Sequence, residues 1–241
     1  MSATPERRAE LETRLAQVRE RLAAACAAAG RGADEVELMA VTKYMPATDV
    51  AALADLGVRA FGESRAQEAA AKAEELGDAR IRWNFIGGLQ RNKARLVVPW
   101  VTRVESVDSP RLAAALDRTV LQALDAGERT APLDVLVQYS VDGDPARGGV
   151  PADGLLDLAS QVTQARGLVL RGLMSVAPLG ADAERAFAAI EAAGNRLRAE
   201  HPDAAVLSAG MSGDLEVAIR HGSTVARVGT ALVGDRRLTS R

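Results

Sequence analysis

The feature that most constrains the fold is a unit that recurs along the chain: a short apolar run, a turn of glycine or polar residues, and an amphipathic helix. None of the apolar runs shows the strict alternation that is typical of a strand with one solvated face. Apolar runs that alternate with helices predict parallel strands covered by helices on both faces of the sheet. The predicted strands are 38–41, 58–61, 81–86, 101–104, 133–141, 169–174, 206–208 and 224–228.

Eight strands in alternation with helices predict an α/β fold, a single (β/α)8 TIM barrel, with an open doubly wound sheet as the alternative. Such barrels have about 250 residues, and this chain has 241. We expect the polar, glycine-rich segment 142–149 to be a mobile loop. The predicted barrel helices are 46–56, 65–76, a short helix after 93, 110–126, 151–166, 182–200 and 214–221.

A further helix is predicted at residues 5–30, before the first strand. We expect it to pack outside the barrel, where a full helix after the eighth strand is missing. The whole chain, 1–241, is expected to form one domain, with the barrel at 37–234 and a polar, frayed tail at 235–241. The apolar side chains on one face of the first helix are Leu11, Leu15, Val18, Leu22 and Ala25.

The composition argues against several classes of function. Basic and acidic residues are interspersed at a net charge of −2, which argues against nucleic-acid binding, and no apolar run suggests a membrane span. The chain has a single cysteine, Cys26, and two histidines, His201 and His221. We therefore expect no internal disulfide, no histidine-based triad and no Cys/His metal site. The charged N-terminus argues against a secretion signal, so we expect a cytoplasmic protein.

Two turns near the end of the chain predict a phosphate site. Gly210-Met211-Ser212 follows the seventh strand, which ends at Ser208, and Gly229-Thr230 follows the eighth. Turns of this composition direct backbone N–H groups and hydroxyls toward one point, and the N-terminus of a helix adds a positive dipole end. In TIM barrels these two loops often bind phosphate. The alternative for each pair is an ordinary turn.

Lys43 lies just beyond the first strand, which neighbours the eighth when the barrel closes. At the end of an apolar strand we expect its amine to be partly buried, which lowers the pKa and frees the amine for Schiff-base chemistry. An aldehyde that carries a phosphate would satisfy both Lys43 and the two turns. A solvated lysine or a salt-bridge partner is the alternative.

Arg227, at the end of the eighth strand, bears on the chemistry of any pyridine ring bound there. A guanidinium stays charged at working pH. If it faces a pyridine nitrogen, it disfavours protonation of that nitrogen and makes the ring a poor electron sink. The alternative is an ion pair with a carboxylate at the barrel rim.

At this point the sequence resembles the pyridoxal phosphate homeostasis proteins, the YggS/PROSC-type proteins that bind pyridoxal 5′-phosphate (PLP). The resemblance spans about residues 5–234. It implies the barrel of the fold-type III PLP proteins, which is related to the N-terminal domain of alanine racemase. Its marks are Ala40-Val41-Thr42-Lys43, Phe61-Gly62-Glu63, Trp83-Asn84-Phe85-Ile86-Gly87, Leu89-Gln90, Asn92-Lys93, Gly172-Leu173-Met174, Leu207-Ser208, Gly210-Met211-Ser212, Gly222-Ser223-Thr224 and Arg227-Val228-Gly229-Thr230.

The resemblance also implies which residues bind the cofactor. Lys43 would hold PLP as an internal aldimine, and Arg227 would face the pyridine nitrogen. Ser212, Gly229 and Thr230 would contact the phosphate. The remaining cofactor-binding positions are Ser208 and Met211 near the phosphate and Met174 in the pocket wall.

Two positions depart from the family pattern. The family usually has Asn where Ser64 stands, and His where Asn84 stands. The side chain of Ser64 is shorter than Asn, so a ring contact made by the usual Asn would be lost or bridged by water.

The function implied is intracellular PLP, vitamin B6 and amino-acid homeostasis, without efficient catalysis. Racemases that resemble this barrel use a second domain and a catalytic tyrosine, and we expect 241 residues to leave no room for that domain. The two tyrosines are Tyr139 and Tyr44, and we expect Tyr44 to point away from Lys43 on an extended backbone. A weak PLP-dependent racemase or lyase is the first alternative, and a Schiff-base aldolase without a chromophore is the second. We expect a monomer, with PLP-dependent apoenzymes as candidate partners.

Overall fold

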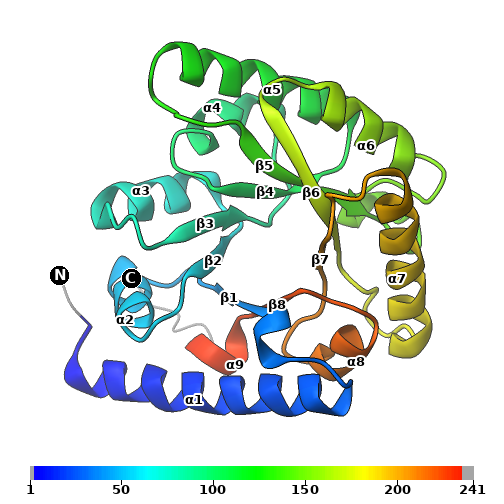
Figure 1. Cartoon of the computed structure of the whole chain (residues 1–241). Coiled ribbons are helices and arrows are strands. Elements are labelled where there is room, and N and C mark those ends of the chain that lie inside the picture. Colours follow the sequence, from blue (N-terminus) through cyan, green and yellow to red (C-terminus); the bar gives the residue numbers. More distant parts are fainter. Residues whose placement is uncertain (1–2, 235–241) are drawn as a thin grey trace.

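The computed structural model describes residues 3–234, in which eight parallel strands close into a barrel in chain order (Figure 1). The closure is direct, since β1 pairs with β8 along four consecutive residue positions. The predicted TIM barrel is therefore confirmed and the open sheet is excluded. The strands are β1 Glu37–Val41, β2 Ala60–Glu63, β3 Arg82–Phe85, β4 Arg103–Val107, β5 Leu133–Tyr139, β6 Leu168–Ser175, β7 Val206–Ser208 and β8 Val225–Val228.

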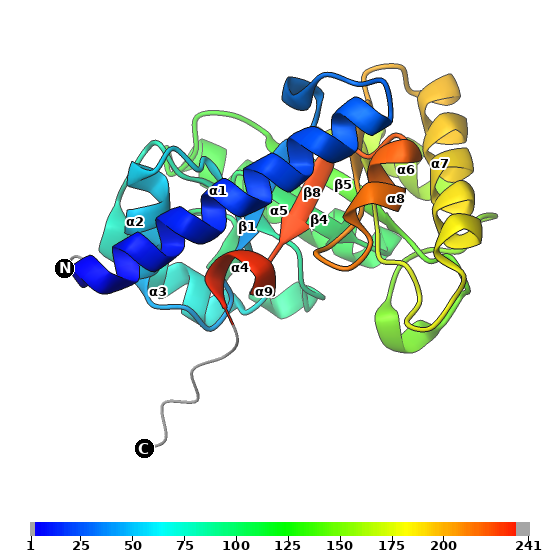
Figure 2. The same ribbon diagram turned by 90° about the horizontal axis from the view of Figure 1, so that it is seen from below.

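Helices surround the barrel, and one of them precedes it in the sequence. The first helix, α1, is capped by the Thr4 hydroxyl, which accepts from the N–H of Arg7. As predicted, it lies outside the barrel, where it crosses the short α9 and α8 beside β1 and β8 (Figure 2). The helices are α1 Pro5–Ala28, α2 Ala47–Asp55, α3 Ala66–Leu76, α4 Ala94–Val97, α5 Pro110–Asp125, α6 Leu155–Gln164, α7 Ala183–Glu200, α8 Leu215–Arg220 and α9 Thr230–Val233.

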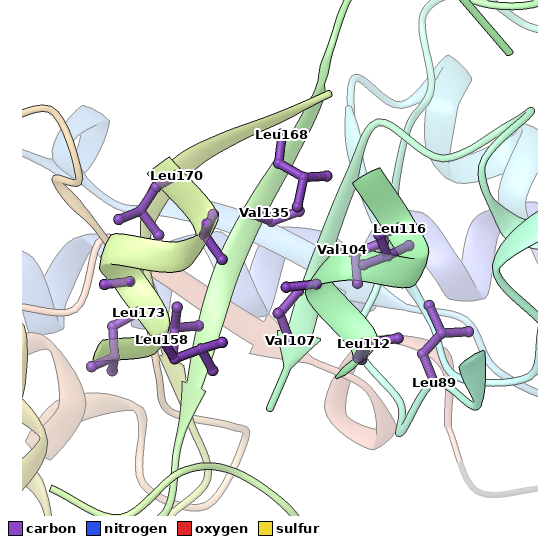
Figure 3. Close-up of a cluster of buried hydrophobic side chains, with 14 of the residues drawn as sticks. Leu89, Val104, Val107, Leu112, Leu116, Val135, Leu158, Leu168, Leu170 and Leu173 are labelled. Atoms are coloured by element: carbon purple, nitrogen blue, oxygen red, sulfur yellow. The ribbon is translucent and has the colours of Figure 1, made fainter. Parts of the chain in front are cut away.

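The main hydrophobic core lies between the barrel wall and the helices. Outward-facing side chains of β4, β5 and β6 interlock with the inner faces of α5 and α6 (Figure 3). The predicted apolar face of α1 is confirmed, since all five of its named side chains are buried. This layer gives the strand ends a rigid frame. The labelled members of the cluster in Figure 3 are Leu89, Val104, Val107, Leu112, Leu116, Val135, Leu158, Leu168, Leu170 and Leu173.

Two strands extend by two or more residues beyond their predicted carboxyl ends. The second was expected to end at 61 and the fourth at 104, but β2 continues to Glu63 and β4 to Val107. The prediction ended each strand where polar residues begin. Glu63 and Glu105 are nevertheless fully buried, because each carboxylate finds an ionic partner inside the fold.

Other differences lie at element ends. Helix α6 begins at Leu155 and not at 151, because residues 152–154 form a turn. The four-residue α9 after β8 was not predicted. Segment 142–149 contains the 3-10 turn Pro145–Arg147 and is joined to β5 by the hydrogen bond from Gln138 Nε2 to Arg147 O. The expected frayed tail at 235–241 lies outside the described residues.

Candidate functional site

The predicted site residues lie at the carboxyl ends of four neighbouring strands: β6, β7, β8 and β1. Met174 pairs in register with Ser208 on the adjacent strand. The N–H of Arg227 donates to Gly210 O at 3.1 Å, which joins the end of β8 to the loop after β7. A Cβ built on Gly229 would lie 3.6 Å from Val41 Cβ, so the start of the last loop packs against the end of β1. These contacts bring together the loops that the sequence predicted to form one site.

The loop after β7 has the conformation of a tight turn around Gly210. Its φ is +87°, and a Cβ there would lie only 2.4 Å from Ala218 Cβ on α8, so only glycine fits this position. The Met211 N–H donates to the Asp214 carboxylate at 2.5 Å. The sequence analysis did not identify a role for this aspartate, whose carboxylate accepts a hydrogen bond from the backbone of the turn. Met211 is exposed and Ser212 is half-buried.

Helix α1 contacts the same loop from the outer side. Arg21 Nη1 donates to Ser212 O at 2.6 Å, while its Nε and Nη2 donate to the two carboxylate oxygens of Glu216 at 2.6 and 2.7 Å. A bidentate arginine–carboxylate pair fixes direction as well as distance. The N-terminal helix therefore supports the loop that the sequence assigned to phosphate.

The loop after β8 presents unused donors at the start of α9. Thr230 is the first helical residue and is exposed, while Gly229 is half-buried. The first N–H groups of a helix have no partner inside that helix. Within residues 3–234, the Ser212 and Thr230 hydroxyls likewise have no hydrogen-bond partner. This donor set suits an oxyanion such as phosphate.

Lys43 sits in a turn directly after β1 and is exposed. The partial burial expected for Lys43 is therefore wrong for this structure. The turn is closed by the hydrogen bond from Met45 N to Thr42 O at 2.9 Å. Tyr44 has a φ of +67°, so its expected extended backbone is also wrong. A left-handed residue in the third position of a turn is the type II pattern.

A buried ionic cluster, which the sequence analysis missed, lies beside this turn. Lys72 Nζ lies 2.9 Å from Glu63 Oε1 and 2.8 Å from Glu68 Oε1. Burial raises the pKa of the Glu63 carboxyl, and the nearby Lys72 ammonium opposes that rise. Glu63 lies on β2, whereas Glu68 and Lys72 lie on α3. Only Glu68 and Lys72, which are four residues apart on one helix, form a pair that can be predicted from sequence spacing.

Arg227 is buried inside the barrel and holds three oxygens. Its Nη1 donates to Ser208 O at 2.7 Å and to Ser208 Oγ at 2.9 Å, and its Nη2 donates to Ser175 O at 2.7 Å. Ser208 Oγ in turn donates to Glu105 Oε2 at 2.6 Å. Burial lowers the pKa of the Arg227 guanidinium, against the attraction of the Glu105 and Asp214 carboxylates.

This network bears on the two interpretations of Arg227. The guanidinium reaches Glu105 only through the Ser208 hydroxyl, so it has no direct ion pair at the barrel rim among the described residues. A guanidinium has five N–H donors, and the three bonds above leave two of them without a partner within residues 3–234. Ser208, by contrast, is buried, and its hydroxyl and carbonyl oxygens are already hydrogen-bonded to Glu105 and Arg227.

The two positions that depart from the family pattern lie near the top of β2 and β3. A Cβ on Gly87 would lie 2.6 Å from Ser64 O, so the two loops touch. Asn84 is buried and its Nδ2 donates to Arg82 O at 3.0 Å and to Phe61 O at 3.3 Å. Asn84 is thus held by neighbouring backbone, and Ser64 packs closely against Gly87.

Two features that other functions would require do not occur in the described part of the chain. Within residues 3–234, no group of His, Cys, Asp or Glu side chains is arranged to hold a metal ion. No helix in that range combines the length and apolar character that crossing a membrane requires.

Comparison with known families matches residues 13–237 to the alanine racemase N-terminal domain. The chain is 50% identical over 253 residues to the pyridoxal phosphate homeostasis protein of Mycobacterium tuberculosis, with 100% of this chain and 98% of that protein covered. It is 38% identical over 230 residues to the protein of the same name from Escherichia coli, with 92% and 95% covered.

Among solved structures, the barrel matches PipY of Synechococcus elongatus with PLP bound. The TM-score is 0.79 at 34% sequence identity, and the match covers 93% of this chain and 100% of PipY. The likeness therefore extends over nearly all of this chain.

Proposed function

The chain belongs to the pyridoxal phosphate homeostasis protein family, and from that premise we propose that it binds PLP as a Schiff base on Lys43 and takes part in PLP, vitamin B6 and amino-acid homeostasis. The observation that carries the proposal is the convergence of a lysine turn and two donor-rich loops at adjoining strand ends. PipY, which shares the barrel, has been solved with PLP bound.

The donor set fits the two ends of PLP. The unpartnered hydroxyls of Ser212 and Thr230, with the N–H groups at the start of α9, suit the phosphate. The Lys43 amine would add to the aldehyde carbon, a C=N bond would form, and one water molecule would leave. Met174 would line the wall, and Ser208, Met211 and Gly229 would shape the loops around the phosphate.

Arg227 supports a binding role over efficient catalysis. When bound, PLP supplies an electron sink, and its strength depends on protonation of the ring nitrogen. A guanidinium fixed at its inner side by Ser208 and Ser175 keeps a positive charge in the barrel, which opposes a second positive charge on the ring. Two free N–H donors of Arg227 would then face a neutral nitrogen as hydrogen-bond donors.

The tyrosines also argue against a racemase. Tyr139 is buried in the outer core cluster with the α5 and α6 side chains. The Tyr44 ring lies under the Arg65 guanidinium, 5.2 Å from the ring centroid. Among the described residues, neither phenol hydroxyl donates to or accepts from a residue of the Arg227 network, which Tyr139 meets only through its backbone carbonyl, the acceptor of Ser175 Oγ. A weak PLP-dependent racemase or lyase stays the second candidate, because the exposed Lys43 amine leaves an acid/base group at the site.

The test is an absorbance spectrum of the purified protein with PLP, before and after borohydride, with mass mapping of the modified peptide. We expect a yellow protein, bleached on reduction, with the label on Lys43. Lys43→Ala should lose the label yet retain some PLP through the phosphate, while Lys93→Ala, which changes a lysine outside the proposed cofactor-binding residues, should behave as the unmodified protein. A label on another lysine would overturn the assignment.

The same protein distinguishes the alternatives. Amino-acid turnover by the PLP-loaded protein, lost in Lys43→Ala, would favour the racemase or lyase. A colourless protein whose Lys43 traps a non-phosphorylated carbonyl would favour the aldolase. A cytoplasmic location, a monomeric state and PLP-dependent apoenzymes as partners stay predictions, which fractionation, ultracentrifugation and PLP-transfer assays would check.

A further inference from the structure

We propose that Glu63, Glu68 and Lys72 form a positioning cluster, which holds the turn around Lys43 in the geometry needed for bond formation with PLP. The inference rests on the proposed function, in which Lys43 is the point of attachment. Its structural basis is that every polar contact of the cluster with the end of β1 falls on the two residues that flank Lys43.

The cluster forms two hydrogen bonds with Thr42, the residue before Lys43. Thr42 Oγ1 donates to Glu63 Oε1 at 2.8 Å, and Lys72 Nζ donates to Thr42 O at 2.8 Å. Thr42, Glu63 and Lys72 are all buried. These bonds are shielded from water, so they fix the place where the chain leaves the barrel wall.

The cluster also forms a hydrogen bond with Tyr44, the residue after Lys43. The Tyr44 N–H donates to Glu68 Oε1 at 2.6 Å, and the Arg65 guanidinium covers the Tyr44 ring. Glu68 and Lys72 share one face of α3 because they are four residues apart, and Arg65 is the N-cap of the same helix. The N-cap and the first turn of α3 therefore hold the far side of the turn.

The turn needs such support because its backbone is strained. Tyr44 is the one non-glycine residue with a positive φ within residues 3–234. Residues in this region persist only where the surroundings over-determine them, and they gather at functional sites. Lys43 itself has no hydrogen bond or ion pair among those residues, so its neighbours set its position.

The composition of the cluster argues for positioning over stability. Two carboxylates share one ammonium, Glu63 is fully buried, and its Oε2 has no partner among the described residues. The free energy lost when charges are removed from water exceeds the attraction between them unless all their hydrogen-bonding groups are satisfied. Buried ion pairs are therefore weak evidence for stability. An apolar contact here would stabilise the barrel but could not hold the polar backbone groups of Thr42 and Tyr44.

The test uses the full chain and measures the rate at which PLP becomes trapped on Lys43 by borohydride. The variants are Glu63→Gln and the half-buried Glu68→Ala, which removes the acceptor of the Tyr44 N–H with little risk to folding. The control is Glu75→Ala, an exposed glutamate on the same helix. We expect both cluster variants to be trapped about tenfold to a hundredfold more slowly, and the control to match the unmodified protein.

A second measurement separates positioning from general damage. In a Lys43→Ala background, Glu68→Ala should leave the non-covalent affinity for PLP unchanged, because no hydrogen bond or ion pair joins the cluster to the two phosphate loops within residues 3–234. Equal losses in trapping and in non-covalent affinity would overturn the positioning role, and so would unchanged trapping in Glu68→Ala. Absence of any label on Lys43 in the unmodified protein would instead refute the proposed function, and this role with it.

Discussion

Gly210 is predicted to tolerate no side chain, because its backbone and its surroundings each exclude one. In Gly210→Ala the new Cβ would stand 2.4 Å from Ala218 Cβ at a φ of +87°. Two carbon atoms at van der Waals contact are about 3.5–4.0 Å apart. Ala218 is buried on α8, so the clash can be relieved only by moving α8 or the loop that carries Ser212.

The expected loss of stability has two parts. An alanine in the left-handed region costs about 1–2 kcal/mol, and an extra methyl group in a packed site costs about 1–3 kcal/mol. The sum, about 2–5 kcal/mol, corresponds to a melting temperature lower by about 10 °C, since 1 kcal/mol shifts a domain of this size by about 2–4 °C. Displacement of the loop should also speed the loss of PLP on dialysis.

Two matched glycines separate these parts in thermal and urea unfolding followed by circular dichroism. Gly30 has a φ of +68°, and a methyl group added there would meet no atom within 4 Å, so Gly30→Ala measures the backbone cost alone. Gly213 has neither constraint, and Gly213→Ala should change stability by less than about 0.5 kcal/mol. If Gly210→Ala is no more destabilising than Gly30→Ala, the close packing of loop and helix inferred here is wrong.

Three further changes test the site and its support. Thr230→Ala should weaken PLP retention by about 1.5–3 kcal/mol, the worth of one hydrogen bond to a charged group, and an unchanged dissociation constant would remove Thr230 from the phosphate site. Arg21→Met removes the bond from α1 to the loop after β7 and should speed PLP loss while changing stability by less than about 1 kcal/mol; equal PLP half-lives would contradict this support. Burial lowers the pKa of His221, but hydrogen bonds to Glu191 and Glu184 raise it above its ordinary value of 6.5. Its stabilising contribution should therefore be full below that value and fade as the pH rises above it, so His221→Gln should cost more stability at pH ~5.5 than at pH ~8.5, and an equal cost at both would refute the pairing.

The sequence was sufficient for the barrel because the strand signal is strong. Apolar runs such as those around Val135 and Leu207 are buried on both sides, and a repeated unit of this kind has few other ways to close. Membership of the family followed from motifs that lie mainly at strand ends. The boundaries of the domain and the cofactor-binding residues stay predictions, although the structure brings their loops together.

The polar interior could not be predicted from the sequence in the same way. The predicted strands ended before Glu63 and Glu105 because a lone carboxylate is seldom buried. Their partners, Lys72 and Arg103, make burial tolerable. A pairing of this kind depends on which side chains face each other after the barrel closes. The exposure of Lys43 and the left-handed Tyr44 were missed for a related reason, since tertiary contacts with α3 hold that turn.

The measurement that tests the account most directly is a crystal structure of the full chain grown with PLP. We expect continuous electron density from Lys43 Nζ to the cofactor, with the phosphate against Ser212 and Thr230 and the ring nitrogen toward Arg227. A phosphate bound elsewhere, or a Lys43 side chain directed away from those two loops, would contradict the central claim.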